Sequence, residues 1–290
     1  MFCSLFGYTK QAYYKHRTGS EHRQKQDMEV RHSVLQLRRH MPRVGTRKLH
    51  YMLHAQPHDN HLKIGRDRLF TLLRHEGLLI TKMRRYTVTT NSKHWLRKYP
   101  DLIKDLHIHR PEQVWVADIT YLDTMGTHSF LHLITDAYSK KVMGYELSDN
   151  MEAISTLKAL KMAIAGRQYP DLPLIHHSDR GLQYCSKVYI QYLQKNNVTP
   201  SMTENGDPYE NAIAERMNGI LKDEFGLGER LGEIDEAIEH TTQSVHTYNE
   251  LRPHLSCQYL TPSQMHKQDK IPRKTWKKKI SKTRQVSEIF

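Results

Sequence analysis

The chain has 290 residues, with 44 Lys and Arg, 31 Asp and Glu, and a formal net charge of +13. This length suffices for one sizeable core with one or two small modules. No apolar run approaches the roughly 18 residues of a transmembrane helix, and the first residues lack the apolar segment of a secretory signal. Cys3, Cys185 and Cys257 are too few and too scattered for a disulfide framework, which favours a reducing cytosol.

The charge is unevenly distributed along the chain. Residues 1–110 contain 23 Lys and Arg against 8 Asp and Glu, residues 111–230 contain 11 against 16, and residues 231–290 contain 10 against 7. A basic module thus precedes a mildly acidic centre and a basic tail. Basic flanks indicate a polyanionic partner, most often nucleic acid. A merely solvated basic surface is the alternative.

Residues 1–80 predict a small all-helical module. Apolar residues at helical spacing predict a helix over residues 28–41, ended by Pro42. A second helix has Thr46 as its N-cap, and a third ends at Gly77 as its C-cap. Short Arg-rich helices joined by tight turns resemble a helix-turn-helix array that binds DNA. A small helical bundle with an ordinary basic exterior is the alternative.

Several basic side chains of this module are predicted to contact DNA. They are Arg47, Lys48, Arg66 and Arg68, together with Arg43 and Arg74. Residues 81–110 follow as a basic linker in which Lys82, Arg84 and Arg85 are candidate phosphate contacts or simply solvated charges. At the other end of the chain, residues 267–290 form a basic tail that we expect to attract phosphates.

Residues 111–230 predict a different architecture, an α/β core. Three strand-like runs at hairpin spacing come first, and a helix, a strand, a helix, a strand and a helix follow. That order is the order of the RNase H-like fold, a mixed five-stranded sheet with helices on both faces. Residues 231–266 extend this core with one more helix and a loop that contains Pro253 and Pro262.

Three acidic residues are the candidate catalytic centre. Asp118 falls inside the first strand, where burial of a carboxylate requires compensation. Asp179 ends the fourth strand, at the sheet edge where α/β proteins place their sites. Glu215 lies on a predicted helix whose polar side is formed by Asn211, Glu215, Asn218 and Lys222. We expect that side to face Asp179.

Hard oxygen donors of this kind suit Mg²⁺ or Mn²⁺, and we expect two ions held by Asp118, Asp179 and Glu215. The substrate would be a DNA phosphodiester, with Lys222 and Asn218 close to it. Taken singly, an Asp in a strand or a Glu on a helix is usually structural or solvated. The three gain weight because they occur on the expected elements in the expected order.

Other reactive residues receive different interpretations. His176 and His177 have no nearby Cys and no His-x-x-x-His spacing on a helix, which argues against a metal site. We favour packing and substrate roles for them and assign substrate contact to His177. Asp136 ends the second strand, and a structural turn role is favoured over a fourth catalytic acid. Ser178 and Cys185 lack an evident base, which argues against nucleophilic catalysis.

The chain resembles the OrfB-type transposases of the IS-three family of bacterial insertion sequences, which share an Asp-Asp-Glu core with retroviral integrases. The resemblance covers most of the chain and is carried by the segments PRVGTRKLHYML, VWVADITYL, HSDRGLQY, ENAIAERMNGILKDE and YNELRPHLSCQYLTPSQM. Its most specific part is the spacing of 35 residues between Asp179 and Glu215, with Lys222 seven positions after that Glu.

This resemblance implies that Asp118, Asp179 and Glu215 are the metal-binding triad and that Lys222 is the basic residue after the Glu. It implies Mg²⁺-dependent cutting at element ends, strand transfer to a target, a homo-oligomer on double-stranded DNA, and a location at the nucleoid of the bacterial cytoplasm. The zinc-binding module of retroviral integrases is missing. The upstream helix-turn-helix that such elements encode in a first reading frame is also missing, so a partner or fusion is expected to supply it.

Two other functions are compatible with the same residues. A catalytically silent, domesticated DNA-binding protein would use the basic helical module and leave the acids idle. An RNase H-like nuclease would use the acids on hybrid or branched substrates.

Overall fold

The computed structural model describes residues 7, 9–55, 64–81, 98–125, 128–204 and 211–267. The candidate phosphate contacts Lys82, Arg84 and Arg85 and nearly all of the basic tail lie outside these residues. Among the helices that are described, none combines the length and the apolar character needed to cross a membrane.

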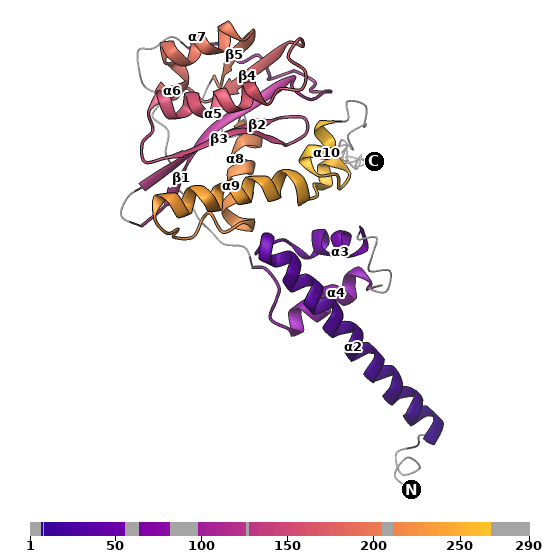
Figure 1. Cartoon of the computed structure of the whole chain (residues 1–290). Helices are drawn as coiled ribbons and strands as arrows, with labels where there is room; N and C mark the ends of the chain where they lie inside the picture. Colours follow the sequence, from indigo (N-terminus) through magenta and orange to yellow (C-terminus); the bar gives the residue numbers. More distant parts are fainter. Residues whose placement is uncertain are drawn as a thin grey trace, which may run out of the picture.

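A five-stranded sheet forms the centre of the molecule (Figure 1). Its strands are β1 (Val114–Asp123), β2 (His128–Asp136), β3 (Val142–Ser148), β4 (Leu174–Ser178) and β5 (Val198–Met202). The order is β3-β2-β1-β4-β5, in which β1, β2 and β3 pair antiparallel and β1, β4 and β5 pair parallel. This is the mixed sheet of the RNase H-like fold, and the prediction of all five strands is confirmed.

Helices cover both faces of the sheet. On one face lie α5 (Ala153–Ala165), α6 (Leu182–Cys185) and α7 (Lys187–Lys195), and on the other lie α8 (Ala212–Glu224) and α9 (Ile234–Leu251) (Figure 1). Gly144 on β3 permits the close approach of α5, because a Cβ there would stand 2.1 Å from the Ala159 carbonyl oxygen. The chain continues through a 3-10 turn, Leu255–Cys257, into the short helix α10 (Pro262–His266), where the sequence predicted only a loop.

Three helices form the N-terminal part of the chain: α2 (Lys10–His40), α3 (Thr46–Ala55) and α4 (Arg66–His75). The expectation of short helices is wrong for α2, which has 31 residues and starts at Lys10 after a Thr9 cap. Only Val30 and Val34 of α2 are buried, so its first half carries no apolar periodicity that could signal a helix. The predicted end of the third helix is confirmed, since Gly77 has the left-handed φ of +67° that favours glycine.

The N-terminal helices contact the α/β core. One buried apolar cluster includes residues of α2, α3 and α4 as well as residues of α8 and α9. The amide of Arg43 donates to the carbonyl of Glu224 at 3.1 Å, and Tyr51 stacks on Tyr259 with 4.5 Å between ring centroids. Glu224 is the last residue of α8, so the contact reaches the helix that carries Glu215.

Candidate active site

Asp118 lies in the middle of β1, level with Asp179, which follows directly after the neighbouring parallel strand β4. In the register between β1 and β4, Val116 pairs with His177. Each Asp comes two residues after one member of that pair, so both carboxylates emerge at the same edge of the sheet. Asp118 is part of β1, whereas Asp179 follows directly after β4 and accepts a hydrogen bond from the amide of Gly181 at 3.0 Å.

The electrostatics of Asp118 show that the acids are close enough to interact. Loss of surrounding water and, next, the negative charges of Asp179 and Glu215 raise the pKa of Asp118 to about 7. Hydrogen bonds from the amide of Ile119 and from Asn218 act in the opposite direction. The three carboxylates therefore share one electrostatic environment in which an added cation would be stabilised.

Two asparagines attach α8 to β1 beside Asp118. Asn218 donates from Nδ2 to Oδ2 of Asp118 at 2.7 Å, and Asn211 donates from Nδ2 to the carbonyl of Ala117 at 3.1 Å. Both asparagines are buried, and Met217, Ile220 and Leu221 bury the apolar side of the same helix. The predicted polar side of α8 thus faces the middle of β1, where Ala117 and Asp118 lie.

Glu215 occupies the same helix one turn before Asn218, but its side chain is exposed. Within the described part of the chain, no three His, Cys, Asp or Glu side chains already form a group that could hold a metal ion. The donors nevertheless fit a hard divalent cation, because all are carboxylate oxygens and the pKa of Asp118 is raised by its acidic neighbours. Glu215, exposed on α8, is the third acid of this set.

The remaining candidates on the core differ in their accessibility. Lys222 is half-buried on α8, two turns after Glu215. His177 is fully buried on β4, where its Nδ1 lies 2.9 Å from Oγ of Ser201, so the expected substrate contact by His177 gives way to packing. Asp136 accepts hydrogen bonds from the amides of Glu112 and Ser139, which confirms its structural turn role.

Four of the six basic residues assigned to DNA in the helical module divide into two pairs. Arg47 and Arg66 are exposed. Lys48 instead forms an ion pair with Glu224, with Nζ 2.7 Å from Oε1, and Arg68 donates to Asp27 on α2 at 2.7 Å. The assignment of Lys48 and Arg68 to DNA is therefore corrected: both attach one element to another. Their partners are 176 and 41 residues away along the chain, beyond the reach of local patterns.

Two buried charge clusters were missed by the sequence analysis. In the first, Glu224 accepts two hydrogen bonds from the guanidinium of Arg252 at 2.8 Å in addition to that from Lys48. In the second, fully buried Glu112 contacts Arg167 at 3.0 Å and His266 at 3.3 Å. A signal for Glu224 existed: an acid in the last turn of a helix opposes the helix dipole, which indicates a compensating cation.

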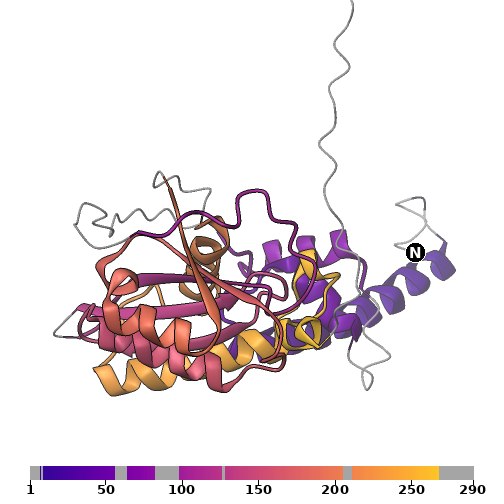
Figure 2. The same cartoon turned by 90° about the horizontal axis from the view of Figure 1, so that it is seen from above.

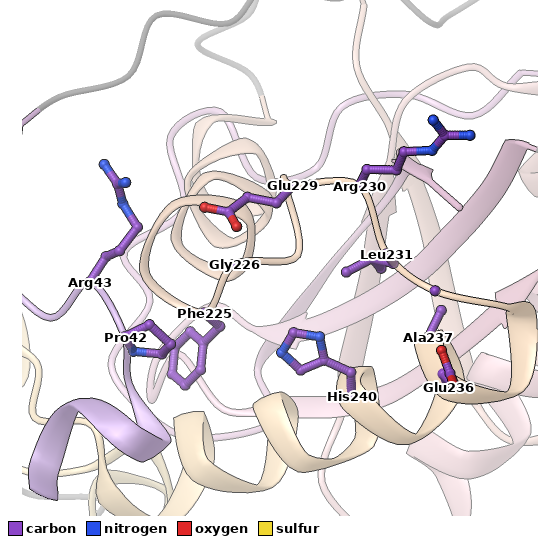
Figure 3. Close-up of a pocket in the computed structure, with 11 residues that line it drawn as sticks. Pro42, Arg43, Phe225, Gly226, Glu229, Arg230, Leu231, Glu236, Ala237 and His240 are labelled. Atoms are coloured by element: carbon purple, nitrogen blue, oxygen red, sulfur yellow. The ribbon is translucent and has the colours of Figure 1, made fainter. Parts of the chain in front are cut away.

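A cavity of about 490 Å³ lies where the N-terminal helices meet the core (Figure 3). It is lined by Pro42, Arg43, the loop from Phe225 to Gly232, and residues of α9 that include His240. None of the three candidate acids lines it. It belongs to the contact between the helices and the core rather than to the acidic site.

The sheet order β3-β2-β1-β4-β5 with helices on both faces is that of an integrase-type core, the core of polynucleotidyl transferases. The integrase core domain family matches residues 108–208, and a second integrase core domain model matches residues 196–262. Since one curated relative is 34% identical over 90% of this chain, the chain belongs to the IS-three family of insertion-sequence transposases, which cleave DNA and transfer strands. This family uses divalent metal and binds DNA.

Three similar proteins illustrate the relationship. The insertion element IS600 uncharacterized 31 kDa protein of Shigella sonnei is 34% identical over 270 residues, covering 90% of this chain and 96% of that protein. Transposase InsF of insertion sequence IS3A from Escherichia coli is 34% identical over 196 residues, 66% of this chain and 67% of InsF. The putative transposase of IS986/IS6110 from Mycobacterium tuberculosis is 30% identical over 205 residues, 69% of this chain and 73% of that protein.

Among solved structures, the HTLV-2 integrase catalytic core domain in complex with magnesium is similar to this chain. The match covers 54% of this chain and 97% of that domain, with 20% sequence identity and a TM-score of 0.44.

Proposed function

We propose that Asp118, Asp179 and Glu215 are the catalytic acids and that together they hold two Mg²⁺ or Mn²⁺ ions. The observation that carries the proposal is that Asp118 and Asp179 each come two residues after the paired Val116 and His177, and that the neighbouring carboxylates raise the pKa of Asp118. Bound there, divalent ions would activate the attacking oxygen and stabilise the leaving oxygen of a phosphodiester. Asn218 keeps Asp118 in position through its hydrogen bond, and Lys222, on the same helix, is our proposed contact for a substrate phosphate.

The proposed reaction has two steps on DNA. Water attacks phosphorus at an element end, the bond to the 3′-oxygen breaks, and a 3′-hydroxyl is released. That hydroxyl then attacks a phosphodiester of the target strand and displaces its 3′-oxygen, so the number of phosphodiester bonds is conserved. Both steps depend on positioning and charge stabilisation rather than on a covalent protein intermediate.

We further propose that successive segments of the chain have different functions. Residues 1–80 bind DNA, with exposed Arg47 and Arg66 among the contacts, residues 81–110 link them to the core, and residues 111–230 perform the chemistry. Residues 231–266 extend the core, and residues 267–290 add a basic tail. The substrates are element ends and target DNA of the bacterial nucleoid, bound by a homo-oligomer. An upstream helix-turn-helix partner or fusion supports recognition of the ends.

The test incubates the protein with duplex DNA that carries the flanking inverted repeats, in the presence of Mg²⁺. We expect nicked and joined products from the wild type, none from Asp179→Asn, and wild-type amounts from Asp171→Asn, whose carboxylate is exposed at the surface before β4. Chelation of the metal should remove the products as completely as Asp179→Asn does. Full activity in Asp179→Asn would overturn the assignment of the site.

The same assay separates the competing functions. DNA binding that depends steeply on salt, with no metal-dependent product under any condition, would identify a silent DNA-binding protein. Cleavage of RNA–DNA hybrids or branched DNA in preference to element ends would identify an RNase H-like nuclease.

A further inference from the structure

The first half of α2 extends away from the rest of the molecule. Figures 1 and 2 both show the N-terminal part of this helix projecting beyond α3 and α4. Residues 10–25, which we call the arm, include no buried residue. Beyond the backbone of the helix itself, no atom approaches within 4 Å of the position of a Cβ at Gly19, so nothing packs on the middle of the arm.

The arm is strongly basic. It contains Lys10, Lys15, Arg17, Arg23 and Lys25 against a single acid, Glu21. Arg17 and Glu21 form an ion pair at 3.2 Å, and the other four cations are exposed. At 3.6 residues per turn these positions point in several directions around the helix, so positive charge is not confined to one face.

A partner must contribute to the order of this helix. Most helical stability in proteins comes from packing of an apolar face, and a helix that is polar on all sides lacks that contribution. The large apolar surfaces of the arm are Tyr13 and Tyr14, which are 50% and 58% exposed. Two adjacent tyrosines do not provide the repeating apolar positions that a coiled coil with a second copy requires.

We propose that the arm is a DNA-binding element that contacts the phosphates on both walls of a duplex groove. The proposal rests on DNA being the substrate and adds a surface to it. The major groove, roughly 12 Å wide, admits an α-helix, and its two walls explain why cations occur around the helix rather than on one side. The arm, about 24 Å long at 1.5 Å per residue, would cover most of one turn of DNA. Lysine, arginine and tyrosine side chains are common phosphate contacts.

Two cations that were expected to contact DNA form ion pairs within the protein instead. Lys48 and Arg68 are occupied by Glu224 and Asp27, so they do not supply the DNA contacts expected of this module. The cations of the arm are exposed on the part of α2 that precedes Asp27. We therefore assign the sequence-independent contacts with DNA phosphates to the arm rather than to the residues near the turn between the helices.

The experiment measures binding of the full chain to a random duplex of roughly four helical turns, by fluorescence anisotropy across a salt series. The test variant carries Lys15→Gln, Arg23→Gln and Lys25→Gln. Glutamine is a good helix former, and the pair between Arg17 and Glu21 remains, so circular dichroism should show unchanged helix content. The matched control replaces three exposed lysines on α5 and α7, with Lys158→Gln, Lys161→Gln and Lys195→Gln.

We expect the test variant to bind at least about tenfold more weakly at low salt, with the slope of log affinity against log salt shallower by about 2 to 3. The control should match the wild type, and a variant with Lys15→Arg and Lys25→Arg should keep full affinity. An unchanged slope in the test variant would overturn the arm as a DNA contact. So would a change in oligomeric state with the slope unchanged, which would assign the arm to a second copy.

These outcomes are independent of the proposed chemistry. If Asp179→Asn abolishes products while the arm variant binds as the wild type does, only the arm proposal fails. If the arm variant loses affinity while no protein forms product, only the catalytic proposal fails.

Discussion

Charges serve different purposes in the catalytic half of the chain and in the arm of α2. In the catalytic half, Glu112 and Glu224 are surrounded by cations that come from distant parts of the sequence. In the arm, four cations are exposed and only Arg17 has an acidic partner in the described structure. Paired buried charges fix one element against another, whereas exposed like charges remain available to a polyanion.

A basic segment therefore does not bind DNA through every basic residue that it contains. The N-terminal module contains both kinds of cation within one small fold. Lys48 reaches Glu224 at the end of α8 and so connects the module to the helix that carries Glu215. Substitutions can separate the contribution of the paired, buried charges from that of the exposed charges.

Replacement of Glu112 should have the largest effect on stability. Glu112→Gln leaves the buried guanidinium of Arg167 without its carboxylate, which should lower the free energy of unfolding by about 3 to 5 kcal/mol. Urea denaturation near neutral pH measures this change. The control is Glu146→Gln, because the pair of Glu146 with Lys158 is exposed and should contribute no more than about 1 kcal/mol.

The stabilisation by Glu112 should also depend on pH. Burial raises the pKa of Glu112, but hydrogen bonds from His266, Gln168 and Arg167 lower it from 4.5 to about 2. A depressed pKa means that the contribution is complete above 4.5 and is lost as the pH falls toward 2. The difference between wild type and Glu112→Gln should shrink within that window. His266 stays protonated there, because contacts with Asp136 and Glu112 raise its pKa above 6.5. A difference that is constant with pH would contradict this account.

Replacement of Glu224 should have the next largest effect. Glu224→Gln removes the carboxylate from buried Arg252 and from Lys48 together, and we expect a loss of about 2 to 3 kcal/mol in the free energy of unfolding. Lys48→Gln should lose less, about 0.5 to 1 kcal/mol, since that side chain is partly exposed. Equal losses in both variants would mean that the ion pair of Arg252 with Glu224 contributes nothing to the free energy of unfolding.

Substitution of Asn218 tests the attachment of α8 to Asp118, the proposed metal ligand. Asn218→Ala removes the hydrogen bond to Oδ2 of Asp118, and a lost contact behind a metal ligand lowers activity or metal affinity by about 10- to 100-fold. The amount of nicked DNA, measured against Mg²⁺ concentration, should show a higher half-saturating concentration. Gln243→Ala, which removes an exposed amide on α9, should leave the curve unchanged. A reduced maximum without a shift in Mg²⁺ dependence would assign Asn218 to folding alone.

The arm should show the smallest effect on stability. The three Gln substitutions of the arm variant change exposed residues, so the free energy of unfolding should stay within about 0.5 kcal/mol of wild type. Urea denaturation of the arm variant gives this value. A loss as large as that of Glu224→Gln would mean that the arm packs on the protein and is not free to bind DNA.

The sequence predicted the sheet well because its strands are short apolar runs with turn residues between them, and such local patterns persist in the fold. It missed the first half of α2 because residues 10–25 bury nothing, so no period marks them as helical. The side of α8 formed by Asn211, Glu215, Asn218 and Lys222 was predicted from spacing, yet the contact of Asn218 with Asp118 joins residues 100 positions apart.

The misassigned residues have a common cause. Lys48, Arg68 and His177 were assigned to substrate by residue type, whereas their partners in the fold are Glu224, Asp27 and Ser201. Charge and hydrogen-bonding capacity are visible in a sequence, but whether a distant residue satisfies them is decided by tertiary structure. Glu112 and His266, 154 positions apart, were overlooked for the same reason.

Binding of Mn²⁺, measured by calorimetry with duplex DNA present, tests the central claim most directly. The proteins compared are the wild type, Asp118→Asn and Asp123→Asn, the last of which changes an exposed carboxylate at the end of the same strand. We predict that wild type and Asp123→Asn bind Mn²⁺ with equal affinity and that Asp118→Asn binds at least about tenfold more weakly. Equal affinity in all three proteins would contradict the assignment of Asp118 as a metal ligand.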